Sequence, residues 1–254
     1  MIKVAVAGYA GRMGSAVVDA VTAAQDMEVV CGIDPYGKEA SFPTFASITE
    51  ALEGASFDVL VDFTQPNVVA ETLKIALPAG VDCVVGTTGM SNETLDSLAK
   101  SAAPGTTLFY APNFTTGAVL MMQFAKAAAP FFPEAEVIEF HHCNKKDAPS
   151  GTAVRTAQII SEARDFTSSA PGSETEVEGA EGARGALVDG VPVHSVRSMG
   201  YVASQEVIFG SMGQSLTIRH DSWDRTSYMP GVLLGIRSVG KTDGLVVGLE
   251  NFMA

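Results

Sequence analysis

Short apolar runs alternate with segments of helical spacing over residues 1–114. The run IKVAVAG at 2–8 is almost entirely apolar, as expected of a parallel strand that is buried on both faces. The segment 11–24 then places Val17 and Val21 on one face of a helix. Further strands are expected at 27–34, 57–64, 81–89 and 106–114, and further helices near 66–79 and 91–103. This alternation predicts an α/β fold with a Rossmann-type, doubly wound parallel sheet.

The pattern changes from about residue 115. A helical segment and the strand-like EAEVIEFHH are followed by a second helical segment at 152–164. Three strand-like segments, VPVHSVRSMG, ASQEVIFGS and QSLTIRHDS, then come without helices between them. This order predicts a second, α+β domain with mainly antiparallel pairing. The Gly-rich acidic segment 172–185 is expected to be a solvated loop, and the tail contains a helix that can return to the first domain.

Composition narrows the classes of function. The chain has 254 residues and a net charge of −13, from 16 basic and 29 acidic residues, which argues against nonspecific binding to nucleic acid or anionic membranes. An anionic ligand then needs a local site. There is no apolar run of membrane-spanning length, no signal-peptide layout, and only three widely spaced cysteines, so we expect a reducing, cytoplasmic location.

A glycine loop joins the first strand to the first helix. Gly8, Gly11 and Gly14 form a GxxGxxG pattern, in which glycine lets the backbone approach a pyrophosphate at the helix start. Asp34 ends the second strand, where a carboxylate accepts hydrogen bonds from a ribose diol. The combination predicts a dinucleotide site. Segments 63–64, 86–89 and 111–114 follow later strands, and ligands bind at this edge of such sheets.

The stretch HHCNKK at 141–146 gathers positive charge in an acidic chain. Histidine and lysine supply protons and charge near neutral pH, so His141, His142 and Lys145 are candidates for acid–base chemistry. A zinc site is a poor interpretation, because three adjacent residues cannot surround a tetrahedral ion. Cys143 as a nucleophile is an alternative for which the sequence identifies no base.

The segment directly after this stretch has the composition of a helix start. Asp147 or Ser150 can cap the helix, and Gly151 and Thr152 would then present free amides to a carboxylate or phosphate. Plain capping explains Ser150 but not the neighbouring cations. The combination therefore predicts that this stretch binds a small anionic substrate.

Several segments resemble one known family, the 4-hydroxy-tetrahydrodipicolinate reductases (dihydrodipicolinate reductases) of bacterial lysine and diaminopimelate biosynthesis. These are GYAGRMG, DFTQP, GTTG, APNF, EFHHCNKKDAPSGTA, GQSLTIRHDSWDR and VGLENF. The HHxxKxDAPSGTA pattern is very specific, whereas GxxGRMG by itself is not. The resemblance covers nearly the whole chain. It implies a dinucleotide-binding domain at 1–114 that is completed by 225–254, and a substrate-binding and tetramerisation domain at 115–224.

The resemblance also implies roles for individual residues. His141 matches the family's proton donor and acceptor, and Lys145 its proton donor. His142, Gly151 and Thr152 match substrate contacts. The dinucleotide contacts match Gly8, Tyr9, Ala10, Gly11, Arg12, Met13, Asp34, Gly86, Thr87, Thr88, Ala111, Pro112, Asn113 and Phe114. No metal is implied.

The implied enzyme is an NAD(P)H-dependent oxidoreductase that reduces a cyclic dicarboxylate to tetrahydrodipicolinate. Some members have an arginine after the ribose acid, suited to an NADP phosphate, whereas this chain has Pro35 with Lys38 nearby, so NADH, NADPH or both are expected as cofactors. One alternative is another Rossmann-fold reductase, such as a semialdehyde dehydrogenase that uses Cys143. Another is a noncatalytic NAD-sensing regulator, which would leave His141 and Lys145 without a role.

Overall fold

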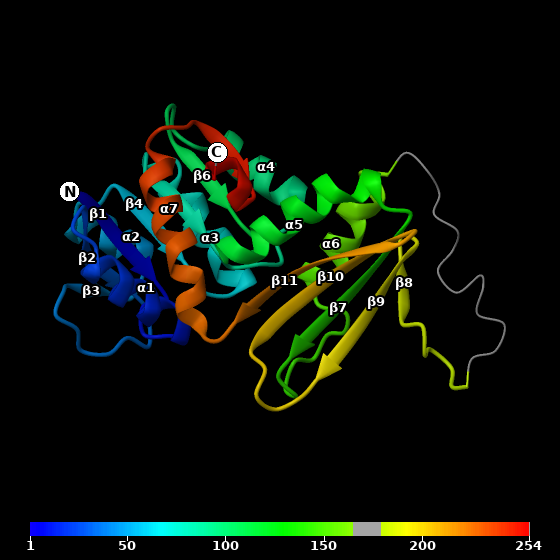
Figure 1. The fold of residues 1–254 in the computed structure, drawn as a ribbon. Helices are drawn as coiled ribbons and strands as arrows, with labels where there is room; N and C mark the ends of the chain where they lie inside the picture. Colours follow the sequence, from blue (N-terminus) through cyan, green and yellow to red (C-terminus); the bar gives the residue numbers. More distant parts are fainter. Residues whose placement is uncertain (165–178, 254) are drawn as a thin grey trace. The chain divides into compact units, whose positions relative to one another are not determined.

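The chain folds into two compact units in a computed structural model that describes residues 1–164 and 179–253 (Figure 1). The first unit comprises Met1–Thr116 together with Arg225–Ala254, and the second comprises Gly117–Asp224. The first seven residues of the predicted acidic loop 172–185 lie outside the described residues, and Gly182 and Gly185 take part in turns.

The first unit is built on a seven-stranded parallel sheet of order β12-β6-β5-β4-β1-β2-β3. Its strands are β1 (Ile2–Ala7), β2 (Met27–Ile33), β3 (Thr44–Phe45), β4 (Val59–Asp62), β5 (Asp82–Val85), β6 (Thr107–Tyr110) and β12 (Gly244–Val247). Its helices are α1 (Arg12–Ala23), α2 (Ile48–Gly54), α3 (Pro66–Ala76), α4 (Asn92–Lys100) and α7 (Met229–Val239), with short 3₁₀ turns η2 (Arg225–Tyr228) and η3 (Leu249–Phe252). The predicted doubly wound fold is confirmed.

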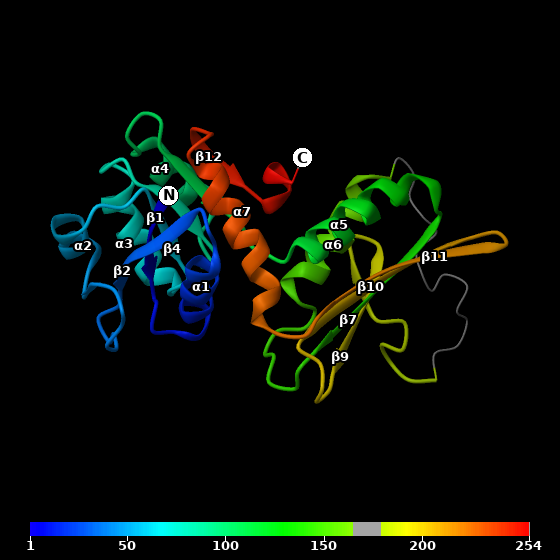
Figure 2. The same cartoon turned by 60° about the vertical axis from the view of Figure 1, so that its left-hand side comes forward.

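Helices cover both faces of this sheet, because successive strand residues point to opposite sides. On one face, Leu60 and its equivalents in other strands pack in a core with α2, α3 and α4. On the other face, Gly235 of α7 lies so close to the sheet that a Cβ there would be 2.7 Å from the Phe109 ring and 3.3 Å from Val84. Helix α1 packs beside α7 on this face (Figure 2).

Three elements of the first unit were absent from the sequence prediction. These are β3, α2 and β12. The two-residue β3 is too short for any periodicity to be visible, and α2 has only seven residues. A signal for α2 exists in the segment SITE, since the Ser47 hydroxyl accepts a hydrogen bond from the Glu50 amide at 3.3 Å.

The second unit is a five-stranded sheet of order β11-β10-β7-β9-β8 with helices on one face. Its strands are β7 (Glu134–His141), β8 (Ala186–Val188), β9 (Val191–Arg197), β10 (Ala203–Ser211) and β11 (Gln214–Ser222). Its helices are α5 (Thr116–Ala128), η1 (Ala129–Phe131) and α6 (Gly151–Glu162). Pairing is antiparallel except between β7 and β9, so the predicted, mainly antiparallel α+β layer is confirmed.

The inner face of β7, which α5 and α6 cover, changes character along the strand. Ala135 and Val137 are buried in the apolar core of the unit. The next two residues on the same face are Glu139 and His141. The register of β9 adds Arg197 beside His141. The helix-covered face therefore ends in a polar cluster next to the start of α6.

Candidate active site

The glycine loop between β1 and α1 has backbone geometry that other residues would not tolerate. Gly8 has a φ of 75°, in the left-handed region that favours glycine. A Cβ on Gly14 would lie 2.0 Å from the carbonyl oxygen of Gly8, so the loop can lie against the helix only because Gly14 has no side chain. Gly11 caps α1 without a side-chain hydrogen bond, which leaves helix-start amides for a ligand.

A pocket of about 980 Å³ opens beside this loop. Of the residues predicted to contact a cofactor, five line it: Gly8, Gly11, Arg12, Met13 and Asp34. Phe63, Thr64 and Gln65 contribute from the end of β4. A glycine cradle, a helix start and an acid at the end of β2 are the features that a dinucleotide requires, so the residues present fit this group.

The acid of this pocket is held in a local turn. Asp34 is partly exposed, and its Oδ1 accepts a hydrogen bond from the Tyr36 amide at 2.9 Å. Pro35 and Tyr36 also line the pocket. The carboxylate of Asp34 therefore has a fixed direction.

Other predicted cofactor contacts do not line this pocket. The Tyr9 side chain is 6% exposed; its ring meets Phe42 edge-on and its hydroxyl donates to the carbonyl of Lys38. Ala10 and the residues at 86–88 and 111–114 are also absent from the lining. Phe114 is 1% exposed and packs against Phe63 and Phe109. Side-chain contact with a ligand is thus restricted at Tyr9 and Phe114.

A buried carboxylate that the sequence reasoning did not single out joins two of the sheet-edge loops. Oδ1 of Asp62 accepts hydrogen bonds from the Thr64 amide at 2.9 Å, the Thr64 hydroxyl at 2.8 Å and the Thr87 hydroxyl at 2.8 Å. Burial raises the pKa of Asp62 above its usual range. Asp62 thereby fixes loop 63–65 relative to loop 86–89.

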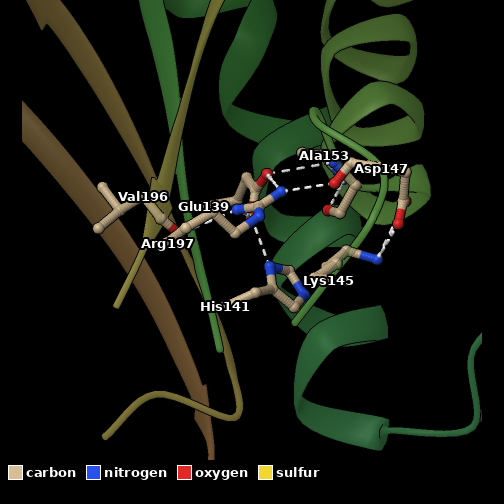
Figure 3. Close-up of polar contacts among 8 residues, drawn as sticks. Glu139, His141, Lys145, Asp147, Ala153, Val196 and Arg197 are labelled. Atoms are coloured by element: carbon tan, nitrogen blue, oxygen red, sulfur yellow. Dashed lines mark hydrogen bonds and ion pairs between the residues drawn. The ribbon is translucent and has the colours of Figure 1, made fainter. Parts of the chain in front are cut away.

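The second unit places His141 in a cluster with Glu139 and Arg197, two residues that the sequence reasoning missed. His141 ends β7, and its Nδ1 is hydrogen-bonded to Oε2 of Glu139, as Figure 3 shows. Arg197 donates from two nitrogens to the two oxygens of Glu139, at 2.7 and 2.8 Å. The Glu139 side chain is fully buried. The Glu139–His141 pair could have been predicted, because residues two positions apart on a strand lie on the same face. The Arg197 contact could not, because it depends on the pairing of β9 with β7.

The contacts of Glu139 extend to the start of α6. Oε1 of Glu139 accepts a hydrogen bond from the Ser150 amide at 3.2 Å, and Arg197 donates to the Asp147 carbonyl at 2.7 Å. Burial opposes ionisation of Glu139, but hydrogen bonds from His141 and Arg197 outweigh it and lower the carboxyl pKa to about 2. Glu139 is therefore an anion at neutral pH that accepts hydrogen bonds from three sides.

Lys145 lies in the loop after β7 and is held at both ends. Its amide donates to the His142 carbonyl at 3.2 Å, and its ammonium donates to the two oxygens of Asp147 at 2.8 and 3.0 Å. The hydrogen bond from Lys145 lowers the pKa of Asp147. His142 is exposed just beyond the strand.

Helix α6 begins with the geometry of an open anion site. Ser150, rather than Asp147, is its N-cap, and the Ser150 hydroxyl accepts from the Ala153 amide at 3.2 Å. Apart from its chain neighbours and the backbone of its own helix, no atom of the described residues lies within 4 Å of the position that a Cβ on Gly151 would take. Gly151 is exposed and Thr152 partly exposed, so an anion can approach this end of α6.

The described residues lack two features that would indicate other classes of protein. None of the helices in residues 1–164 and 179–253 combines the length and the hydropathy needed to cross a bilayer. The same residues contain no group of three or more His, Cys, Asp or Glu side chains arranged to hold a metal ion.

Two family models together match almost the entire chain. The model for the dihydrodipicolinate reductase N-terminus matches residues 2–114, and the model for the dihydrodipicolinate reductase C-terminus matches residues 117–253.

Relatives and solved structures agree with these matches. Proteins named 4-hydroxy-tetrahydrodipicolinate reductase from Listeria welshimeri and Streptomyces coelicolor are each 49% identical, over 99% of this chain and 100% and 98% of their own lengths. A dipicolinate-bound dihydrodipicolinate reductase from Paenisporosarcina sp. TG-14 superposes with a TM-score of 0.89 at 42% identity and covers 99% of both chains. A scyllo-inositol dehydrogenase from Lactobacillus casei, with 11% identity and a TM-score of 0.63, shares the fold alone. The chain belongs to the dihydrodipicolinate (4-hydroxy-tetrahydrodipicolinate) reductase family.

Proposed function

We propose that this protein is an NAD(P)H-dependent oxidoreductase that reduces 4-hydroxy-tetrahydrodipicolinate to tetrahydrodipicolinate, in lysine and diaminopimelate biosynthesis. The observation that carries the proposal is the cluster of His141, Lys145 and the open start of α6, in a chain that matches this family from end to end. The dipicolinate bound by the Paenisporosarcina relative supports a cyclic dicarboxylate as the substrate class.

The first unit is proposed to bind the cofactor. Gly8 to Met13 and the start of α1 would hold the pyrophosphate, and Asp34 the adenosine ribose. Gly86 to Thr88 and Ala111 to Phe114, at the ends of the next strands, would support the remainder through their backbones. When bound, the reduced nicotinamide supplies the hydride.

The second unit is proposed to bind and protonate the substrate. Gly151 and Thr152 at the start of α6 would hold one ring carboxylate, with His142 as a further contact. Reduction leaves negative charge on the ring, which His141 and Lys145 would neutralise by charge and by proton transfer. Both terminal nitrogens of Arg197 already donate to Glu139 and to the Asp147 and Val196 carbonyls, which favours a supporting role over substrate contact.

Cofactor choice is proposed to be permissive, with NADH used at least as well as NADPH. The carboxylate of Asp34 favours a free ribose diol and repels a 2′-phosphate, and Pro35 provides no cation beside it. Pro35→Arg should therefore raise kcat/KM for NADPH relative to NADH, measured in steady-state assays with each cofactor. A wild-type enzyme that strongly prefers NADPH would contradict this proposal and implicate another cation, such as Lys38.

We also propose a cytoplasmic homotetramer that assembles through residues 115–224. The proposed assembly surface is one face of the sheet of the second unit. The helices α5 and α6 both pack on the opposite face and leave this one without a helix. The face without them carries Ile138, Phe140 and Ile208, all of which are partly exposed among the described residues of this unit.

The decisive test is substrate-dependent oxidation of NADH by the purified protein, followed by absorbance. The heterocyclic dicarboxylate should drive oxidation, and His141→Ala should abolish most of it while leaving NADH binding intact. Absence of turnover by the wild-type protein would reject the proposal.

A semialdehyde dehydrogenase would instead need a nucleophilic cysteine. Cys143 is exposed in the loop after β7. Cys143→Ala should retain turnover of the dicarboxylate, whereas a cysteine-dependent enzyme would lose it. Family membership favours the reductase.

A further inference from the structure

The buried carboxylate of Glu139 is unusual in its set of partners. Glu139 is hydrogen-bonded to His141, to two nitrogens of Arg197 and to the Ser150 amide, and the Ser195 side chain also forms a hydrogen bond that lowers its pKa. The Arg197 guanidinium and the Ser150 amide can only donate, and the Ser195 hydroxyl donates when its partner is an ionised carboxylate. Both oxygens of Glu139 are thus acceptors, and the neighbouring His141 nitrogen fits this pattern only as a donor.

From this geometry we infer that Glu139, held by Arg197, is a positioning residue that keeps the proton of His141 on Nδ1 and reserves Nε2 for exchange with the substrate. The inference rests on the proposed function, in which His141 transfers a proton. When the ring gives up a proton from Nε2, the Nδ1 proton stays in its hydrogen bond to Glu139. A neutral ring with its proton on Nε2 could not accept one there.

Arg197 has a defined part in this arrangement. It binds Glu139 through two nitrogens and anchors to the Asp147 carbonyl, so the carboxylate cannot rotate away from the imidazole. It also balances the charge of a carboxylate that is fully buried. Because the carboxyl pKa is lowered to about 2, Glu139 remains an acceptor across the working range of pH and does not take the proton itself.

The substitution Glu139→Gln distinguishes positioning from packing. The amide keeps the size of the side chain but replaces one acceptor oxygen by a donor. An amide oxygen that remains with Arg197 and Ser150 turns the NH₂ group toward His141, where it favours a ring that accepts at Nδ1 and carries its proton on Nε2. This variant should shift the tautomer of His141 toward Nε2–H.

The same strand offers a matched control. Glu136, on the opposite face of β7, is bonded to His194 at 2.8 Å and to Arg184. Glu136→Gln changes a glutamate–histidine–arginine group of the same composition that contains none of the proposed site residues. It should alter the signals of His194 alone. Because Glu136 lies opposite Ile208 on the sheet face proposed for assembly, kcat is compared between samples of the same oligomeric state, where it should stay within about twofold.

The experiment is nitrogen-15 NMR of histidine-labelled protein, with His141 assigned from His141→Asn, alongside steady-state kinetics. At a pH where the ring is neutral, wild-type His141 should show a protonated Nδ1 and an unprotonated Nε2. Glu139→Gln should shift the ring toward protonated Nε2 and lower kcat by about 10²–10⁴-fold, the range for loss of a general acid or base, with the NADH dissociation constant unchanged.

Three results would overturn the inference. The first is a wild-type His141 that is protonated on Nε2 alone. The second is a folded Glu139→Gln protein with an unaltered tautomer. The third is a folded Glu139→Gln protein whose kcat per folded molecule is unchanged. If the single variant does not fold because Arg197 is left unpaired, the double variant Glu139→Gln, Arg197→Met removes both charges. The tautomer of His141 and kcat are then measured in the double variant, with the same expected results.

Failure of the proposed function would be a separate result. Absence of NADH oxidation by the wild-type protein rejects the reaction, whereas the tautomer is measured without substrate.

Discussion

Single side chains at the end of β7 have contacts that restrict what each can do. Arg197 is hydrogen-bonded to both oxygens of Glu139 and to the Asp147 carbonyl, Lys145 is bonded to the exposed Asp147, and His142 lies beyond the strand in solvent. An ion pair with an exposed partner is weak, so the ammonium of Lys145 can exchange Asp147 for a substrate oxygen at little cost in free energy. The cation best suited to meet a ligand is therefore Lys145.

Lys145→Met should lower kcat by about 10²–10⁴-fold while the NADH dissociation constant is unchanged. Methionine keeps most of the length of the side chain and removes only its charge and its protons. Steady-state kinetics and a cofactor titration measure the two effects. Lys126→Met, at an exposed position of α5, is the control and should be neutral. A well-folded Lys145→Met protein with normal kcat would exclude Lys145 from the reaction.

The sequence pointed to the residues of this stretch but not to the contacts between them. His141, Lys145 and Ser150 are neighbours in one segment, and their chemistry is visible from residue type. Arg197 lies over 50 positions further along the chain and reaches Glu139 only because β9 pairs with β7 in one register. Tyr9 shows the opposite case, since the family resemblance implied a ligand contact while its side chain is buried.

At the scale of elements, the cofactor pocket depends on how closely the β1–α1 loop lies against its helix. Gly14→Ala places a methyl group 2.0 Å from the Gly8 carbonyl oxygen, so α1 or the loop must move. We expect the affinity for NADH to fall by at least tenfold and the unfolding free energy by about 1–3 kcal/mol.

Fluorescence titration with NADH and chemical denaturation test both effects of Gly14→Ala. Gly240→Ala is the control at the end of α7, where a Cβ would lie 3.8 Å from Oδ2 of Asp82, an ordinary contact distance. It should leave NADH affinity unchanged. Equal affinities of Gly14→Ala and wild type would show that this loop is not the pyrophosphate site.

The buried carboxylate of Asp62, at the end of β4, leads to a prediction about how the stability of the protein depends on pH. Because burial raises the pKa of Asp62 above its ordinary 3.8, the folded state binds its proton more tightly than the unfolded state does. The contribution of Asp62 to stability is therefore present below 3.8 and is lost as pH rises through the raised pKa. Asp62→Asn keeps an acceptor for Thr64 and Thr87, and its stability relative to wild type should increase as pH rises in this window.

Urea denaturation at a series of pH values measures this difference. Asp26→Asn provides a control of opposite sign, since the hydrogen bond from Arg237 lowers the pKa of Asp26. The Asp26 contribution is present above its ordinary pKa and is lost as pH falls, so the relative stability of Asp26→Asn should decrease as pH rises. A flat or falling difference for Asp62→Asn would contradict the account of its burial.

Long helices and strands could be predicted from the sequence, whereas short ones were missed. The long segments with clear periodicity, such as β1, α1, α6 and β10, appeared at nearly the bounds that the structure gives. Strand β12 was missed because the tail was interpreted as a helix only, although GLVVG is a short apolar run between glycines. Short elements are specified by their partners in the sheet, which one sequence does not display.

At the scale of the whole molecule, the proposed assembly makes a prediction about mass. Light scattering should give four times the chain mass of 26.4 kDa. Ile208→Lys places a charge on the sheet face that α5 and α6 leave uncovered, and should yield smaller species. Val247→Lys, at an exposed position of β12, should remain tetrameric. A monomeric wild-type protein would reject the assembly, and a tetrameric Ile208→Lys protein would reject this surface.

The division of the chain has a consequence for the order in which it matures on the ribosome. The first unit needs Arg225–Ala254, because α7 covers Val84 and Phe109 and β12 pairs with β6. During translation, residues 1–116 emerge with that apolar face uncovered and stay so while 117–224 are made. The second unit, although synthesised later, is contiguous and can complete its own contacts first. The nascent chain is thus expected to expose a chaperone-binding surface until residues 225–254 leave the exit tunnel.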